Sequence, residues 1–173
     1  ENCEEFISSI TRYITKNDWK TYYSKSKALA FGEIIAKRLK GENKSTGEFF
    51  EALGFKAGTE KAQEYLIKAV EIYRKIYGEG SIKEGQIYLK LAALQRDMVF
   101  YVDENEINKL WLIMQKYHKK YLDIIKNNFK NQPEKLAEGY IKLAQAYEEI
   151  NFDAIFFDIA EEAAWNEAEK YYL

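Results

Sequence analysis

Apolar residues recur at helical spacing along almost the whole chain, and this periodicity constrains the fold more than any other feature. Ala62, Tyr65, Ala69 and Ile72, for example, fall on one face of a helix. The residues that separate short strands are scarce, since the 173 residues include 1 Pro and 9 Gly. Because a sheet of many short strands needs such residues in its turns, the pattern predicts an all-α protein.

Capping signals divide the chain into eight expected helices. In a capping box, a short polar residue and a Glu three positions later satisfy free amides of the first helical turn. The chain contains three, which pair Ser45 with Glu48, Ser81 with Glu84, and Asp103 with Glu106. Pro133 stands at a plausible first helical position. The glycines expected at helix ends or turns are Gly41, Gly54, Gly58, Gly78 and Gly80.

The second helix is expected to start at Asn17 or Asp18 and end near Leu39, and the longest helix to run from about Glu104 to Lys130. Short connections predict that consecutive helices are antiparallel. The residues expected to face inward are, helix by helix, Phe6, Ile10 and Tyr13; Trp19, Tyr22, Leu29 and Ile34; Phe49, Phe50 and Leu53; Ala62, Tyr65, Ala69, Ile72 and Ile76; Ile87, Leu91, Leu94 and Met98; Leu110, Met114, Tyr117, Tyr121, Ile124 and Ile125; Leu136, Tyr140, Leu143 and Tyr147; and Phe156, Ile159, Ala160 and Ala163.

The charges are balanced, with 26 basic and 28 acidic residues and a formal net charge of -2. This balance gives no electrostatic signal for nucleic acid, and no apolar run is long enough to span a bilayer. The chain begins at Glu1, so we expect a trimmed or a processed protein that is cytoplasmic or exported with its leader removed. Cys3 is the single cysteine, which excludes an internal disulfide.

Part of the sequence repeats with an offset of 52 residues. Tyr88-Leu-Lys-Leu-Ala92 returns as Tyr140-Ile-Lys-Leu-Ala144. Held without gaps, the offset also pairs Tyr65 with Tyr117, Lys68 with Lys120, Ile72 with Ile124, and Lys83 with Lys135. These matches predict an internal structural repeat.

These residues resemble the tetratricopeptide repeat family. Tyr140, Leu143, Ala144 and Tyr147 are similar to the signature of the first helix of such a repeat. The segment from Ala62 to Glu79 is similar to the second helix of the longer repeats in kinesin light chains and many bacterial members. The sequence departs from the family in its 52-residue spacing and in two residues, because Gln95 replaces an aromatic residue and Phe156 a small one.

The resemblance implies tandem antiparallel helix-turn-helix repeats that form a short right-handed solenoid. We expect a single domain, 1–173, with a divergent helical hairpin at 1–40 and about two and a half to three repeats at 46–173. In the family, partner segments bind in a concave groove lined by the first helix of each repeat. The residues in those positions are Gln86, Leu89, Lys90, Ala93, Arg96, Glu138, Ile141, Lys142, Gln145 and Glu148. The family's asparagine and lysine clamp for a terminal carboxylate is not matched, because Leu89, Ala93, Ile141 and Gln145 occupy its places.

The residues for catalysis or metal binding are scarce. His118 is the only histidine, and we interpret it as a packing or edge residue because it has no visible catalytic partner. We interpret Cys3 as structural or incidental, and Asp158, Glu161 and Glu162 as a solvated helix face. No glycine-rich phosphate loop is present, so we expect neither an enzyme nor a bound cofactor or metal.

We therefore expect a protein-interaction module that binds a peptide or helical segment of a partner. A helical-repeat sensor that closes around a peptide or small ligand is the alternative, and an unusual all-α enzyme is a third possibility. The C-terminal helix carries Phe157, Trp165, Tyr171 and Tyr172 beyond its inner stripe. We expect this aromatic surface to be covered by self-association or by another molecule.

Overall fold

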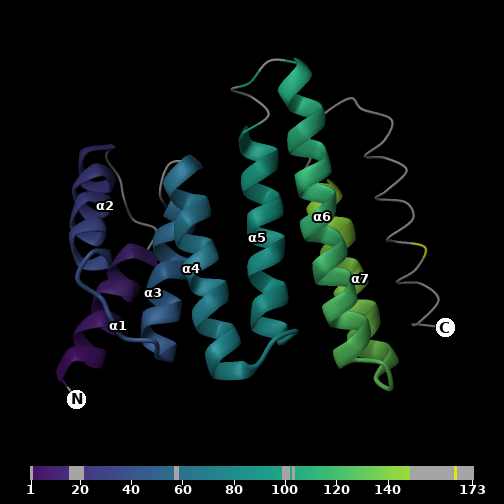
Figure 1. The fold of residues 1–173 in the computed structure, drawn as a ribbon, viewed down its shortest axis with the longest axis horizontal. Coiled ribbons are helices and arrows are strands. Elements are labelled where there is room, and N and C mark those ends of the chain that lie inside the picture. The colour runs from purple at the N-terminus through teal and green to yellow at the C-terminus, as the bar shows by residue number, and fades with distance from the viewer. Residues whose placement is uncertain are drawn as a thin grey trace. The chain divides into compact units, whose positions relative to one another are not determined.

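The computed structural model describes residues 2–15, 22–56, 59–98, 102, 104–148 and 166. Within these ranges the chain forms seven helices longer than a single turn and no strand, which confirms the all-α prediction (Figure 1). The expected eighth helix, with Phe156, Phe157, Ile159, Ala160, Ala163, Trp165, Tyr171 and Tyr172, lies outside the described residues, as do Asn17, Asp18, Trp19 and Gly58.

The chain forms two compact units that divide between Glu79 and Gly80. The predicted single domain, 1–173, includes both units and stays a prediction. In the first unit, α3 packs against α4, and α1 packs against α3. Its helices are α1 (Asn2–Thr15), α2 (Tyr22–Ala36), α3 (Lys44–Lys56) and α4 (Thr59–Tyr77). In the second unit, α6 contacts both α5 and α7, and α5 also contacts α7. Its helices are α5 (Ile82–Met98), α6 (Glu104–Asn128) and α7 (Pro133–Glu148).

The polar residues that start the helices agree only partly with the predicted capping boxes. At α5 the Glu84 amide donates to the Ser81 hydroxyl at 3.4 Å, and the Glu84 carboxylate accepts from the Gly80 amide at 2.8 Å. The capping box predicted for Ser45 and Glu48 is wrong, because Asn43 caps α3 by accepting a hydrogen bond from the Thr46 amide at 2.9 Å. Ser45 therefore lies inside the first turn. Pro133 begins α7 as predicted, and Asp103 lies outside the described residues.

Two of the predicted turn glycines require the freedom that glycine provides. Gly78 and Gly80 have φ angles of 86° and 74°, in the region that residues with a Cβ disfavour. Gly54 was expected at a helix end, and that prediction is wrong because it lies inside α3. A Cβ at Gly54 would stand 2.7 Å from Leu66 Cγ of α4, so this glycine serves close packing and not a turn.

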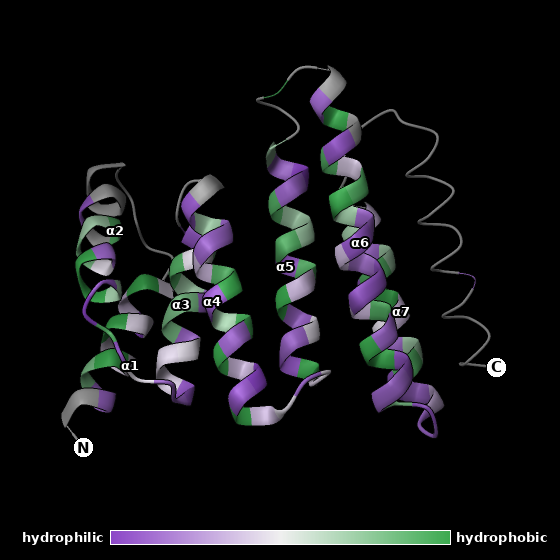
Figure 2. Cartoon of the chain, in the orientation of Figure 1, coloured by the Kyte–Doolittle hydropathy of each residue, from purple (hydrophilic) through white to green (hydrophobic). Residues whose placement is uncertain are grey.

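Most of the expected inward residues are buried, but four are exposed. Phe6 and Tyr13 are 54% and 62% exposed, because α1 buries Ile7 and Ile14 together with Ile10, which was predicted to face inward. Ile34 of α2 and Ile76 of α4 are 52% and 37% exposed. In the second unit Leu94, Met98, Tyr117 and Tyr147 are half-buried. Figure 2 shows hydrophilic and hydrophobic residues alternating along α6, as expected for a helix with one packed face.

The helix pairs α3–α4 and α5–α6 repeat the same contact between a glycine and an isoleucine. A Cβ at Gly47 of α3 would lie 3.2 Å from Ile72 Cγ2 of α4, and one at Gly85 of α5 would lie 3.2 Å from Ile124 Cγ2 of α6. Ile72 and Ile124 were paired by the 52-residue offset. The sequence repeat therefore corresponds to a repeated contact between paired helices.

A group of two rings and a lysine also recurs in both helix pairs. Phe50 stacks on Tyr65 at 6.0 Å, and Tyr88 stacks on Tyr117 at 5.9 Å. The ammonium of Lys68 lies 5.6 Å from the Phe50 ring centre, and that of Lys120 lies 4.7 Å from the Tyr88 ring centre. Tyr65 and Lys68 are the residues that the offset pairs with Tyr117 and Lys120, so this part of the predicted repeat is present in three dimensions.

The first helices of the two pairs align at a shorter offset than their second helices. Gly47 and Gly85 are 38 residues apart, whereas Ile72 and Ile124 are 52 apart. Most of this difference arises because α5 and α6 have 17 and 25 residues, whereas α3 and α4 have 13 and 19, and the step from Met98 to Glu104 between α5 and α6 is also longer than the step from Lys56 to Thr59. A search of the sequence at the single offset of 52 residues therefore does not align α3 with α5, although the two helices make the same contacts.

We expect Gly47→Ala to destabilise the first unit. Its new Cβ would stand 2.6 Å from the Tyr73 ring, which is completely buried and has no space to move into. Overpacking costs about 1–3 kcal/mol, of which the better helix propensity of alanine recovers about 0.5–1 kcal/mol. Urea unfolding should show that Gly47→Ala lowers the free energy of unfolding by about 1 kcal/mol. Gly41→Ala is the control, because Gly41 is exposed and its nearest neighbour would be 3.4 Å away. Equal midpoints for the two variants would contradict this packing account.

Candidate functional site

The predicted groove residues of α5 lie opposite its buried face. The buried residues of α5 are Glu84, Gly85, Ile87, Tyr88, Leu91, Ala92 and Gln95. Gln86 is exposed, and Leu89, Lys90, Ala93 and Arg96 are half-buried. The helical periodicity therefore leaves these five residues on the side of α5 that points away from the core.

The groove residues of α7 repeat this pattern. Glu138, Lys142 and Gln145 are exposed, and Ile141 is half-buried. Glu148 is the last residue of α7, and its side chain is not among those described. Since α5 contacts α7 directly, the two sets of residues belong to neighbouring helices of one unit. Leu89 and Ile141, which occupy the same repeat position, are thus the large apolar side chains of this surface.

A buried network holds the beginning of α5 in place. Glu84 is 2% exposed, and its carboxylate accepts hydrogen bonds from the Gly80 amide and from the Tyr88 hydroxyl, each at 2.8 Å. Lys120 of α6 donates to the same Tyr88 oxygen at 3.5 Å. Asn128 donates to the Gly80 carbonyl at 2.8 Å. These bonds fix α5 against α6 and so orient the face that carries Leu89.

His118 is a core residue, in agreement with the packing interpretation. It is 3% exposed on α6, and its ring meets Tyr147 of α7 edge-on at a centre distance of 4.5 Å. Within the described part of the chain, its Nδ1 atom has no hydrogen-bond partner. Burial lowers the pKa of His118 to about 4, so the ring is neutral at physiological pH.

Other buried titratable groups also serve packing. Tyr73 donates to the Glu51 carboxylate at 2.6 Å, and burial together with that bond raises the Tyr73 pKa strongly. Burial raises the pKa of Tyr121 to about 12, and its hydroxyl donates to the Gly139 carbonyl at 3.1 Å. Both tyrosines therefore stay protonated and act as hydrogen-bond donors between neighbouring helices, Tyr73 from α4 to α3 and Tyr121 from α6 to α7.

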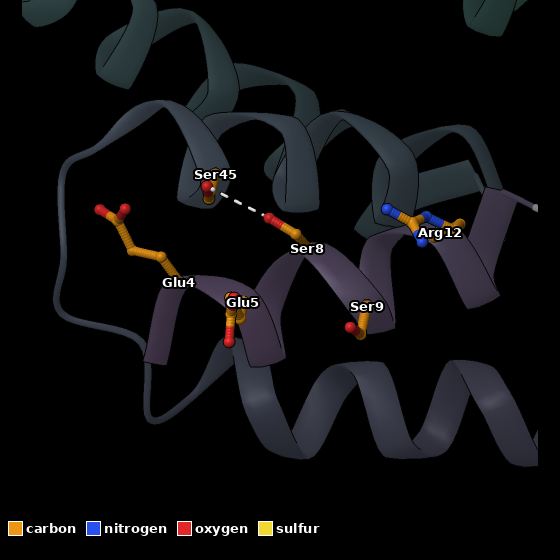
Figure 3. Close-up of a pocket in the computed structure, with 6 residues that line it drawn as sticks. All are labelled: Glu4, Glu5, Ser8, Ser9, Arg12 and Ser45. Atoms are coloured by element: carbon orange, nitrogen blue, oxygen red, sulfur yellow. Dashed lines mark hydrogen bonds between the residues drawn. The ribbon is translucent and has the colours of Figure 1, made fainter. Parts of the chain in front are cut away.

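A polar cleft of about 430 Å³ lies on the surface of α1 and α3 in the first unit (Figure 3). Its lining residues are Glu4, Glu5, Ser8, Ser9, Arg12 and Ser45. The Ser8 hydroxyl donates to the Ser45 hydroxyl at 3.4 Å, while the Glu4 carboxylate accepts from Asn43 at 2.7 Å. An activated serine requires a base bonded to its hydroxyl, whereas the Ser8 hydroxyl is bonded to another hydroxyl. The cleft was not predicted from the sequence, because Ser8 and Ser45 are far apart along the chain.

The described residues contain no group of three or more His, Cys, Asp or Glu side chains placed to hold a metal ion. The side chain of Cys3 and the acidic residues Asp158, Glu161 and Glu162 are outside the description. None of the described helices is both long and apolar enough to cross a bilayer. No protein-family model matches the chain, and no curated protein or solved structure is significantly similar to it.

The low pKa of His118 predicts a stability loss in mild acid. Between pH 6.5, the ordinary pKa of histidine, and about pH 4, His118 binds a proton in the unfolded chain but not in the folded chain. Stability should therefore fall as the pH drops from 6.5 to 4, by up to about 3 kcal/mol at 1.36 kcal/mol per pKa unit. His118→Phe should remove this part of the slope while keeping the ring contact with Tyr147.

Urea unfolding of the wild type and of His118→Phe between pH 7 and pH 4 measures this effect. The carboxylates titrate in both proteins, so their contribution cancels in the difference between the two free energies of unfolding. Parallel stability curves for the two proteins would contradict the assignment of the slope to His118.

Proposed function

We propose that the chain is a non-catalytic interaction module of the tetratricopeptide type. In this proposal its helix pairs stack into a short right-handed solenoid, and the face formed by α5 and α7 binds a peptide or helical segment of a partner protein. The proposal is supported by the repeated contacts of the pairs α3–α4 and α5–α6. It also draws on the resemblance of the first-helix residues Tyr140, Leu143 and Ala144 to that family.

The observation that carries the binding proposal is the contrast between two pairs of repeat-related residues. Leu91 and Leu143 occupy one repeat position and are 0% and 5% exposed. Leu89 and Ile141 occupy another and are only half-buried. A large apolar residue that recurs at a position outside the core is an anchor that an amphipathic segment would cover.

The charges around these anchors are mixed. Lys90 is half-buried and Lys142 is exposed, while Glu138 is exposed on the same face of α7. Arg96 is paired with Asp97, with 2.9 Å between the guanidinium Nε and the carboxylate. Surface ion pairs contribute only about 0–1 kcal/mol each. The charges of this face would therefore determine the orientation of the bound partner segment, and the apolar anchors would supply most of its binding free energy.

A sensor of small ligands or peptides remains the alternative. Such a protein would enclose its ligand, as binding pockets bury most of the ligand surface. Two clefts lined by described residues of the first unit, one at α1–α3 and one at α1–α2, are open to solvent. Binding of an extended or helical segment on an open face is therefore the better supported function.

We expect Leu89→Asp combined with Ile141→Asp to abolish partner binding with little effect on folding. The half-buried positions allow the new carboxylates to stay hydrated. Leu91→Asp combined with Leu143→Asp is the matched comparison, because it buries two unpaired carboxylates and should unfold the unit at a cost of several kcal/mol. Thermal melting of both double variants measures the difference.

The partner is identified by affinity capture from the lysate of the source organism, followed by mass spectrometry. Proteins captured by the wild-type chain should be lost with the Leu89 and Ile141 double variant. They should be retained with Leu112→Asp combined with Ile113→Asp, which changes exposed residues of α6 in the same unit. Collapse of the fold in the Leu89 and Ile141 variant would show that these residues belong to the core and would overturn the proposed groove.

A further inference from the structure

A second apolar surface lies on the first unit, apart from the face formed by α5 and α7. It is a cleft of about 320 Å³ between α1 and α2. Its lining residues are Phe6, Ile7, Phe31, Ile34, Ile35, Arg38 and Leu39. Six of these seven residues are apolar, and the seventh is a cation.

The apolar residues of this cleft are unusually exposed for their size. Phe6 is 54% exposed, Phe31 is 48% and Ile34 is 52%. Single exposed apolar side chains are common on proteins, but here three large ones line the same opening. Burying them under a partner would contribute about 25 cal/mol for each Å² removed from water.

The end of the cleft at Arg38 is basic. Lys37, Arg38 and Lys40 are all exposed, and none of their side chains has an ion-pair partner in the described part of the chain. Three carboxylates of the first unit have other partners: Glu33 pairs with Lys61 at 2.9 Å, Glu42 pairs with Lys75, and Glu4 accepts from Asn43 at 2.7 Å. An occupant with a negative charge at this end would complement Arg38.

The shape of the cleft limits the occupant further. The apolar residues of α2 that line the cleft run from Phe31 to Ile35, about one helical turn or ~6 Å, and Leu39 lies beyond the end of the helix at Ala36. Because the cleft is open, it covers only one side of its occupant and leaves the other side in water. An alkyl chain has no polar side to expose, whereas an amphipathic helix has one apolar stripe and one polar face.

We propose that the α1–α2 cleft docks an acidic amphipathic helix from another protein. Apolar residues of that helix, spaced three and four apart, lie against Phe6, Phe31 and Ile34. A carboxylate at one end of the helix pairs with Arg38. This site involves none of the residues of the α5 and α7 face, so either proposal can fail without the other.

The test uses the full chain and a synthetic amphipathic peptide of about four helical turns. The peptide carries Leu along one stripe and Glu on the outer positions, and a matched peptide carries Lys in place of Glu. Fluorescence anisotropy of the labelled peptides should show that the Glu peptide binds at least about tenfold more tightly than the Lys peptide. Arg38→Gln should weaken the binding of the Glu peptide about fivefold, which corresponds to the ~1 kcal/mol that an exposed ion pair contributes at most.

Matched variants test whether peptide binding depends on the cleft itself or on the general charge and hydrophobicity of the unit. Ile34→Asp should abolish peptide binding, and Ile34→Ala should weaken it severalfold if the aspartate variant fails to fold. Ile67→Asp on α4 is the apolar control, because Ile67 is 39% exposed and does not line the cleft. Lys44→Gln removes an exposed cation elsewhere on the unit and should leave the affinity unchanged.

Three results would overturn the proposal. Equal binding of the Glu and Lys peptides, or equal losses with Arg38→Gln and Lys44→Gln, would show that no specific charge is recognised. Sedimentation showing a dimer that Ile34→Asp dissociates, without peptide binding, would assign the cleft to a second copy of the chain. Binding of dodecanoate or of anionic phosphatidylserine vesicles that depends on Arg38 and Ile34, without peptide binding, would assign it to lipid.

Discussion

Close approach of paired helices at residues without a large side chain is the constraint on which the rest of this structure depends. Gly47 and Gly85 bring the first helix of each pair against an isoleucine of the second. The stacked rings and the lysine that covers them recur only because this approach sets the same register twice. Interiors are packed without spare volume, so a Cβ at Gly47 would displace the Tyr73 ring, and one at Gly85 would push Ile124 back by a few tenths of an ångström.

The periodicity of the sequence predicted most of the helices and much of the core, because packed faces require apolar residues at helical spacing. It failed where two faces of one helix are both apolar. On α1, Phe6 and Tyr13 lie on a plausible stripe, yet the helix buries Ile7 and Ile14 against its neighbours. Likewise Gly54 is indistinguishable in sequence from a terminating glycine, because only the position of Leu66 on another helix shows that it serves packing.

The predicted groove depended on the repeat register more than on residue type. Leu89 and Leu91 are both leucines two positions apart, and composition does not distinguish a buried residue from a half-buried one. The register does, since each residue aligns with a partner in α7 of the same burial. The α1–α2 cleft was not predicted, because the residues that line it belong to helices outside the matched repeats and its chemistry depends on which carboxylates pair elsewhere.

The unequal lengths of the two helix pairs have a consequence for how such a chain can change over evolution. The pairs share their contacts near Gly47 and Gly85, at the beginning of each first helix, while the extra residues of α5 and α6 extend the opposite end of the hairpin. Insertions of whole helical turns there leave the contacts that the two pairs share in register. One end of the hairpin is therefore free to acquire new length and new surface, while the other end keeps the architecture constant.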